Sequence, residues 1–268
     1  MNYITSANNN MVKEVKSLKQ KKNREEKGRF FIEGLRFVSE ALEESWQIET
    51  IILSDSFCLN ESNKQLISLI SDRKFNCYTV TDKIFGELSE TSTPQGILAV
   101  MQTKMFEISD IIKAGSFMVI LDSIQDPGNL GTIIRTADAA GAGGILMSKG
   151  CVELFNPKVL RSTMGSVFHL PIVVDCDLSE SIQTLKEYGI KAYAAHLSGE
   201  LSYFECNLRE NCAIIVGNEA NGISDDVANI ADVLVKIPMP GKAESLNASV
   251  AAGILMYEAV RQRIGIKE

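Results

Sequence analysis

The sequence predicts an α/β protein in which a parallel-sheet domain follows a smaller α/β domain. Along most of the chain, short apolar segments alternate with segments of helical period. The most apolar segments lack polar alternation, as expected for strands buried on both faces of a parallel sheet. A length of 268 residues is long for one domain and suits two. We therefore predict domains at residues 1–103 and 116–268.

Composition places the chain among ordinary globular proteins, with 45% hydrophobic and 23% charged residues. No apolar run approaches the roughly 20 residues of a membrane span. The first ten residues lack the basic and apolar regions of a secretory signal, so we expect a cytoplasmic protein with no membrane association. Six scattered cysteines without a Cys-x-x-Cys pair, and two histidines, predict reduced thiols and no metal site.

The first domain is predicted to alternate helices and strands. Helices are expected at 8–22, 35–44, 64–72 and 83–88, and strands at 29–33, 49–53, 77–80 and 96–102. The residues expected to face the core from the first two helices are Met11, Val15, Leu18, Leu35, Val38 and Leu42. The weakly patterned segment 103–115 is the expected boundary, with room for a short helix.

One segment departs from the net charge of −7. Residues 13–29 hold eight basic side chains against three acidic ones. Such a run is most often a solvated helix face, and the alternative is a local phosphate-binding surface.

The second domain is organised around residues 121–141, LDSIQDPGNLGTIIRTADAAG. The apolar run 117–121 predicts a buried strand that ends at an Asp-Pro-Gly turn. A helix is expected to start near Asn129, a good N-cap residue. Its apolar residues recur at i, i+3, i+4 and i+7. Arg135 and Asp138 share the neighbouring face with a glycine, which is typical of a binding site.

The remaining elements continue the alternation. Strands are expected at 144–147, 172–174, 191–195, 213–216 and 233–237, and helices at 157–164, 179–188, from 224, and at 246–263. In parallel sheets, ligands bind beyond the carboxyl ends of the strands. Polar loops occupy three of those ends, at 122–129, 217–222 and 238–247.

Two of these loops also have simpler interpretations. The turn GNEANG at 217–222 allows close backbone approach to a ligand, or it is a strand-to-helix turn capped by Ser224. In the last loop, Ser245 or Asn247 can cap the final helix. Residues 248–257 carry no charge and many small side chains, which predicts close helix packing, including packing in a dimer.

The sequence contains none of the common nucleotide or hydrolase motifs. It has no Walker motif, G-x-S-x-G elbow, H-E-x-x-H pair or dinucleotide fingerprint, which argues against a nicotinamide-dependent oxidoreductase. The segment Gly141-Ala142-Gly143-Gly144 follows a helix and precedes a strand, so it predicts a helix end and turn. The residues alone thus indicate a three-loop polar site and a basic arm, but no reaction.

Three segments together resemble a known family. DSIQDPGNLGTIIRTADAAG, IIVGNEANGIS and IPMPGKAESLNASVAAGILMYE stand in the order and spacing of the three motifs of the SpoU (TrmH) RNA methyltransferases. The similarity covers about 117–263. In the front half, FFIEGLRFVSEAL and TPQGILAV resemble the substrate-binding domain often fused ahead of that catalytic domain.

The resemblance implies a SPOUT fold, whose parallel sheet carries a C-terminal trefoil knot. It also implies S-adenosylmethionine bound in the knot, and a homodimer with active sites at its interface. The positions that would line the cofactor pocket are Gly217, Ile237, Leu246, Leu197 and Met239. The polar motif positions are Asn129, Arg135, Glu219, Ser245 and Asn247.

The implied reaction is attack of an RNA ribose 2′-hydroxyl on the sulfonium methyl group. The resemblance makes Arg135 central to this step. Because a guanidinium stays protonated at ordinary pH, we expect Arg135 to hold the adjacent phosphate and stabilise the developing oxyanion. Asn129, Glu219 or Ser245 would complete the hydrogen-bond network.

The N-terminal domain would then bind RNA. The residues predicted to contact RNA phosphates are Lys21, Lys22, Arg24 and Arg29. Large-subunit ribosomal RNA is the expected substrate, since the front domain suits a structured target. Transfer RNA is the alternative substrate, and a non-catalytic RNA-binding protein of the same fold is the alternative function.

Overall fold

The computed structural model describes residues 2–44, 46–73, 75–115 and 117–264. The chain divides into two compact units. Unit 1 consists of residues 1–104 and 155–160, and unit 2 of 105–154 and 161–268. Residue 116, at which the predicted second domain begins, and residues 265–268 at its end lie outside the described residues.

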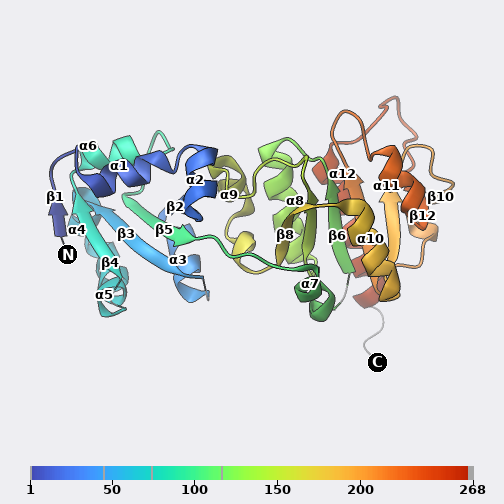
Figure 1. The fold of residues 1–268 in the computed structure, drawn as a ribbon, viewed down its shortest axis with the longest axis horizontal. Helices are drawn as coiled ribbons and strands as arrows, with labels where there is room; N and C mark the ends of the chain where they lie inside the picture. The colour runs from blue at the N-terminus through green and yellow to red at the C-terminus, as the bar shows by residue number, and fades with distance from the viewer. Residues whose placement is uncertain (1, 45, 74, 116, 265–268) are drawn as a thin grey trace. The chain divides into compact units, whose positions relative to one another are not determined.

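Unit 1 is built on a five-stranded mixed sheet with the order β1-β4-β3-β5-β2 (Figure 1). The strands are β1 Asn2–Ile4, β2 Arg29–Glu33, β3 Ile48–Ser54, β4 Asn76–Val80 and β5 Ile97–Gln102. β1, β4 and β3 are parallel, whereas β5 is antiparallel to both its neighbours. The helices are α1 Asn10–Ser17, α2 Lys21–Lys27, α3 Leu35–Glu43, α4 Asp55–Leu59, α5 Lys64–Asp72 and α6 Asp82–Leu88. β1 and α4 were not expected from the sequence.

The prediction of one helix over 8–22 is wrong, because the segment forms α1 and α2 with a break between them. At the break, the guanidinium Nη1 of Arg24 donates to the carbonyl oxygens of Leu18 and Lys19, at 2.7 and 2.9 Å. These two carbonyls therefore accept hydrogen bonds from a side chain instead of from the backbone N–H groups that would continue a helix. Val15 and Leu18 are buried as predicted.

A second correction concerns α3. Val38 and Leu42 are buried as expected, but Leu35 is 39% exposed. Leu35 is the first residue of α3, and helical side chains tilt toward the helix N-terminus, so its side chain projects past the end of the helix.

An aromatic cluster explains why residues 155–160 belong to unit 1. The ring of Phe155 stacks on Phe30 with centroids 4.4 Å apart. Trp46 meets the Phe30 ring edge-on at 6.1 Å. Phe30 is fully buried, so this contact contributes to the core of unit 1.

Unit 2 contains a seven-stranded sheet in the order β10-β12-β9-β11-β6-β7-β8, with all pairs parallel. The strands are β6 Phe117–Asp122, β7 Ile145–Ser148, β8 Ile172–Cys176, β9 Lys191–Ala195, β10 Leu201–Ser202, β11 Cys212–Gly217 and β12 Val233–Lys236. The helices are α7 Ile108–Ala114, α8 Pro127–Ala139, α10 Leu178–Glu187, α11 Asp225–Ile230 and α12 Ala248–Ile264, while α9 Pro157–Thr163 begins in unit 1 and ends in unit 2. This is the predicted parallel sheet, extended by the short edge strand β10.

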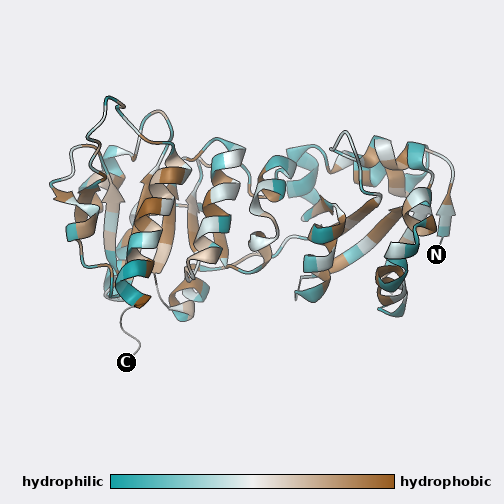
Figure 2. Cartoon of the chain, turned by 180° about the vertical axis from the view of Figure 1, so that it is seen from behind, coloured by the Kyte–Doolittle hydropathy of each residue, from teal (hydrophilic) through white to brown (hydrophobic). Residues whose placement is uncertain are grey.

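Helices cover both faces of the unit 2 sheet. Apolar residues of α7, α10 and α11 form one core with alternate residues of β6, such as Met118 and Ile120. α8 and α12 pack against each other, and α12 also packs on β11, which places this pair over the other face (Figures 1 and 2). The hydropathy colouring of Figure 2 follows the strands, in agreement with their burial.

The predicted start of the central helix at Asn129 is wrong. α8 begins at Pro127, and its N-cap is Asp126, whose carboxylate accepts the backbone N–H of Asn129 at 2.8 Å. Proline suits the first helical position because the N–H groups of the first turn have no acceptor within the helix, so the N–H that proline lacks is not needed there. Asn129 therefore lies inside the first turn, with its side chain free for other contacts.

None of the helices in the described ranges is long and apolar enough to span a bilayer.

Candidate active site

Hydrogen bonds draw together the three polar loops that follow β6, β11 and β12. Asn247 Nδ2 donates to Asn129 Oδ1 at 2.8 Å, and Asn129 Nδ2 donates to Glu219 Oε1 at 3.0 Å. A single amide side chain on α8 thus bridges the two other loops. Asn129 and Asn247 are neutral, whereas the bond from Asn129 to the Glu219 carboxylate is charge-assisted.

The Glu219 carboxylate also organises the loop after β6. It accepts the backbone N–H groups of Gln125 at 3.2 Å and of Asp126 at 3.0 Å. Partial burial alone would raise the pKa of Glu219, but the hydrogen bonds from Asn129, Asp126 and Gln125 outweigh that effect and lower the pKa. Glu219 is therefore ionised at neutral pH and is a poor proton acceptor.

Residues next to these positions support the network, and among them only Ser224 had been named from the sequence, as a helix cap. Asn218 Nδ2 donates to the carbonyl of Ser123 at 2.7 Å, and the carboxylate of Asp122 accepts Ser224 N–H at 2.7 Å. Ser123 has φ of +60°, an unfavourable value for a serine, and its N–H is held by Ser148 Oγ at 2.9 Å. Strained backbone held by several bonds is frequent at functional sites.

Asn247 has a second role at the start of α12. Its Oδ1 accepts the N–H groups of Ser249 at 2.9 Å and Val250 at 3.2 Å. Of the two caps considered from the sequence, Ser245 and Asn247, the structure selects Asn247. The capping oxygen and the bridging amide nitrogen belong to one side chain, so the first turn of α12 is held beside Asn129.

Arg135 lies on α8 about 9 Å along the helix axis from Asn129. Its side chain is exposed and makes no hydrogen bond or ion pair with any residue that the structure describes. Ser245 is likewise exposed and unbonded within the described ranges. The structure thus joins Asn129, Glu219 and Asn247 directly, and leaves Arg135 and Ser245 accessible to a ligand.

The five residues predicted to line a cofactor pocket lie at or after the carboxyl ends of β9, β11 or β12. They are Leu197, Gly217, Ile237, Met239 and Leu246. A Cβ on Gly217 would lie 2.2 Å from the backbone of Gly222, so the tight turn requires glycine. In the described chain, the backbone of residues 239–246 makes no internal hydrogen bond. Those exposed N–H and C=O groups suit a ligand that is recognised through the backbone.

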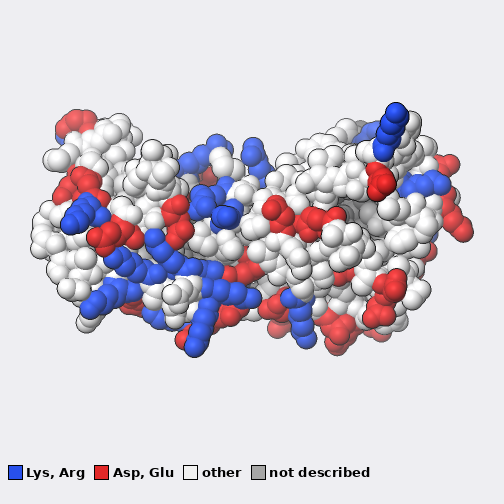
Figure 3. Space-filling model, turned by 90° about the horizontal axis from the view of Figure 1, so that it is seen from above, with Lys and Arg blue, Asp and Glu red and all other residues white. Residues whose placement is uncertain are grey.

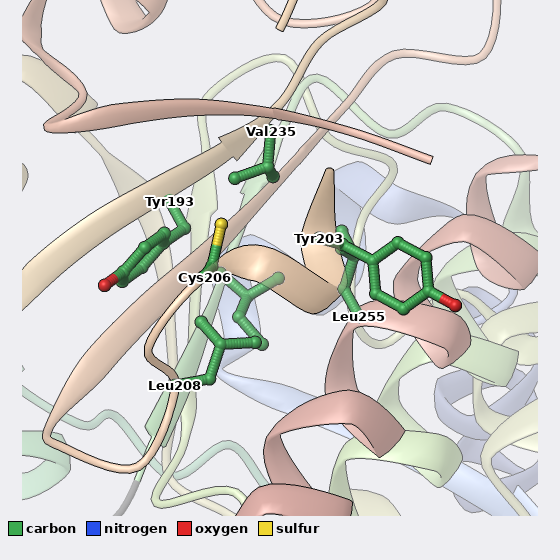
Figure 4. A pocket seen from close by; sticks show the side chains of 7 residues that line it. Tyr193, Tyr203, Cys206, Leu208, Val235 and Leu255 are labelled. Carbon is green, nitrogen blue, oxygen red and sulfur yellow. The ribbon is translucent and has the colours of Figure 1, made fainter. Parts of the chain in front are cut away.

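The apolar pocket shown in Figure 4 is distinct from the predicted cofactor site. It is lined by Tyr193, Tyr203, Cys206, Leu208, Ile214, Val235 and Leu255. It has room for about one water molecule and includes none of the predicted cofactor residues. We interpret it as a packing void between the sheet and α12. Among the described residues, no group of three or more His, Cys, Asp or Glu could hold a metal ion.

Several basic residues of unit 1 pair with acidic partners. Lys21 and Lys22 pair with Glu25 and Glu26, four residues further along α2, at 3.4 and 3.7 Å. Both lysines remain exposed, and Figure 3 shows Lys and Arg side chains gathered on this part of unit 1.

The two predicted arginine contacts differ from those lysines. Arg29 pairs with Glu14 and with Glu49, each at 2.7 Å. Arg24 is 4% exposed and bonds the backbone carbonyls at the end of α1. Its burial argues against the predicted contact with RNA phosphate, because a phosphate cannot reach a guanidinium enclosed in this way.

Comparison with known proteins decides the family. The model of the SpoU rRNA Methylase family matches residues 116–257, and that of the MRM3-like substrate binding domain matches residues 9–99. The chain belongs to the SpoU rRNA methylase family. The resemblance predicted from the three motifs is thereby confirmed, together with the methyltransferase class.

Relatives in the SpoU family match this chain over nearly its full length. The 23S rRNA (guanosine(2553)-2'-O)-methyltransferase RlmP of Bacillus subtilis is 38% identical over 257 residues, 96% of this chain and 98% of RlmP. The 23S rRNA (uridine(2479)-2'-O)-methyltransferase of Streptomyces viridochromogenes is 30% identical, over 97% of this chain and 92% of that protein.

A solved structure agrees on the fold and on the cofactor. The AdoMet-bound rRNA methyltransferase of Sinorhizobium meliloti has a TM-score of 0.86 and 34% identity, covering 97% of each chain. This agreement confirms the predicted α/β fold with a parallel sheet, and S-adenosylmethionine as the predicted cofactor.

Proposed function

We propose that this SpoU-family chain transfers the methyl group of S-adenosylmethionine to a ribose 2′-hydroxyl of large-subunit ribosomal RNA. The observation that carries the proposal is the bridge from Asn247 through Asn129 to Glu219. Asn129, at the centre of this bridge, lies on the same helix as Arg135, and Arg135 has no partner among the described residues. Two relatives named above are 23S rRNA 2'-O-methyltransferases, one for a guanosine and one for a uridine. Because they differ in the base, we assign only the ribose as the target.

The cofactor would be held by the loops after β9, β11 and β12. Gly217, Ile237 and Leu246 are the principal residues, with Leu197 and Met239 at the margins. The exposed backbone groups of residues 239–246 fit this role, because they are donors and acceptors without internal partners in the described chain. When bound, the cofactor supplies an electrophilic methyl group on a sulfonium.

Arg135 would act on the RNA rather than on the cofactor. A ribose hydroxyl is a weak nucleophile and gains negative charge as it attacks. The protonated guanidinium can hold the neighbouring phosphate with two of its N–H groups and stabilise that charge. Ser245, which is exposed and unbonded within the described ranges, would contact the same substrate.

Asn129, Glu219 and Asn247 would position the loops around the reaction. The Glu219 carboxylate is ionised and occupied by N–H donors, so we assign it a positioning role and not that of proton acceptor. Positioning of this kind accounts for a large share of the rate in reactions that bring two bound partners together.

We further propose the trefoil knot and the homodimer that the family resemblance implies. The location of β12 between β10 and β9, with a loop that returns to Asn129, supports a threaded C-terminal segment. On α12, Val250 and Tyr257 are about half exposed, and Ile254 between them is partly exposed. This i, i+4, i+7 apolar stripe suits packing against a second copy of the chain.

Unit 1 would bind the RNA through the basic surface of α1, α2 and the start of β2, with Lys21, Lys22 and Arg29 as contacts. Surface ion pairs such as those of the two lysines are weak, so RNA phosphates can compete for these cations. With ribosomal RNA as substrate, the enzyme would work in the cytoplasm.

The direct test is methyl transfer from labelled S-adenosylmethionine to large-subunit ribosomal RNA and to transfer RNA, both lacking their native modifications. Label on one ribosomal ribose, mapped by cleavage that 2′-O-methylation blocks, is the expected result. Label on transfer RNA would support the proposed reaction but show that its substrate is transfer RNA and not ribosomal RNA. Absence of label on both, with cofactor binding intact, would overturn the proposed activity in favour of an RNA-binding protein.

A further inference from the structure

A carboxylate lies on α8 close to Arg135 but is bonded elsewhere. Asp138 follows Arg135 by three positions, a spacing that places the two side chains on the same face of the helix. Arg and Asp at this spacing ordinarily attract each other. Here Asp138 Oδ2 instead meets His169 Nδ1 at 2.8 Å, and Arg135 has no ion pair among the described residues.

The chemistry of the pair identifies the donor. An ionised carboxylate accepts hydrogen bonds and donates none, so the proton lies on His169 Nδ1. His169 follows the short helix Ser166–Phe168, which packs against α8. The residue His169 is exposed, and the side chains of His169 and Asp138 are 30% and 26% exposed. The Asp138 carboxylate is nevertheless occupied by His169, and Arg135 is left without an ion pair among the described residues.

We propose that His169 is a positioning residue that occupies the Asp138 carboxylate and so keeps the Arg135 guanidinium available to the RNA. The inference rests on the proposed function, in which Arg135 binds substrate phosphate. The inference extends the site beyond the three polar loops, since His169 comes from the segment before β8. Without His169, Asp138 turns toward Arg135 and competes with the phosphate.

The expected effect is modest, because exposed ion pairs on a helix shift an equilibrium by a factor of about two to five. In a His169→Ala variant, the fraction of molecules in which Arg135 is not paired with Asp138 should therefore fall about two- to fivefold. An effect of this size is separable from the removal of Arg135 itself, whose effect is far larger.

The first measurement follows the guanidinium directly and needs no substrate. Phenylglyoxal modifies accessible arginines, and peptide mass spectrometry gives the modification rate of Arg135 in the full-length protein. Relative to wild type, His169→Ala should slow this rate about two- to fivefold. The double variant His169→Ala with Asp138→Asn should restore it, because the asparagine cannot form the ion pair. Equal rates in wild type and His169→Ala would overturn the proposal.

The second measurement is methyl transfer by the same variants, with kcat and KM for RNA determined separately. His169→Ala should lower kcat/KM about two- to fivefold with unchanged affinity for S-adenosylmethionine, and the added Asp138→Asn should recover it. His169→Asn, which keeps an N–H donor near the Nδ1 position, should also recover it. A decrease that Asp138→Asn fails to rescue would mean that His169 acts through folding alone, and would overturn the proposal.

Two further controls separate the possible failures. If His169→Ala does not fold, His169→Phe keeps a ring without the Nδ1 donor and takes its place in both measurements. If wild type transfers no methyl group while the phenylglyoxal rates follow the expected pattern, the proposed function fails and the positioning of Arg135 stands.

Discussion

Three cationic side chains of unit 1 and one of unit 2 have opposite environments in this SpoU-family protein. In unit 1, Lys21 and Lys22 face glutamates one turn away, and Arg24 is enclosed by backbone carbonyls. In unit 2, Arg135 is exposed without a partner among the described residues, and its nearest acidic neighbour on α8 is held by His169. Positive charge in a sequence therefore does not reveal which cations are available to a ligand.

The difference separates three uses of a basic side chain. A buried arginine that bonds carbonyls stabilises the fold, because its removal leaves those acceptors without partners. A surface lysine paired with glutamate on its own helix contributes little to stability and can exchange its partner for a phosphate. An exposed arginine without a partner, such as Arg135 among the described residues, is available to a substrate without first breaking an ion pair. The following variants test this division, in order of decreasing effect.

Replacement of Arg135 should have the largest effect. Arg135→Ala is expected to reduce methyl transfer about 10²- to 10³-fold, the size found when one group that stabilises transition-state charge is removed. Affinity for S-adenosylmethionine, measured by calorimetry, should stay within a few-fold. Arg135→Lys is the matched control, since it keeps the charge without the bidentate geometry and should recover part of the rate. A large decrease in cofactor affinity in Arg135→Ala would contradict the assignment.

Removal of the bridging amide should come next. Asn129→Ala disconnects the loops that carry Glu219 and Asn247, and the resulting misplacement is expected to lower methyl transfer by up to about 10²-fold. Single-turnover rates at saturating cofactor measure this decrease. Asn60→Ala removes a side-chain cap in unit 1 and serves as the control, with the rate of methyl transfer unchanged. An Asn129→Ala enzyme of wild-type rate would show that the bridge has no catalytic role.

The third variant tests stability instead of activity. Arg24→Ala leaves the carbonyls of Leu18 and Lys19 without their donor and is expected to lower the free energy of unfolding by about 2 kcal/mol. Urea denaturation followed by circular dichroism measures the change. Lys21→Ala, an exposed neighbour on the same helix, should change it by less than about 0.5 kcal/mol. If the two variants were equally stable, Arg24 would not have the structural role assigned here.

The smallest effect is expected from the exposed lysines. The double variant Lys21→Ala with Lys22→Ala should weaken RNA binding several-fold and flatten its salt dependence. The log–log slope should fall by up to about 0.7–0.9 for each RNA phosphate that the variant no longer neutralises. A salt titration of the binding constant provides the measurement. Lys64→Ala, which removes another glutamate-paired lysine of unit 1, is the control with an unchanged slope. An unchanged slope in the double variant would exclude α2 as an RNA-binding surface.

The sequence by itself determined the alternation of strands and helices and the polar loops at the ends of the strands. These features depend on local patterns, namely runs of apolar residues, helical periodicity and turn residues such as Asp-Pro-Gly. The three motifs added the family, because several spaced segments matched it together. The bridging residues Asn129, Glu219 and Asn247 were all among the predicted positions.

Only the tertiary structure decided which of these residues meet and which cations are free. The bonds of Asn129 join residues 90 and 118 positions away in the chain, and the ring of Phe155 reaches Phe30 in unit 1. Local patterns carry no information on such distant partners. The same reason explains the errors, since the break after α1 depends on how Arg24 is buried. A side chain's role follows from its neighbours in space, and those are set when the whole chain has packed.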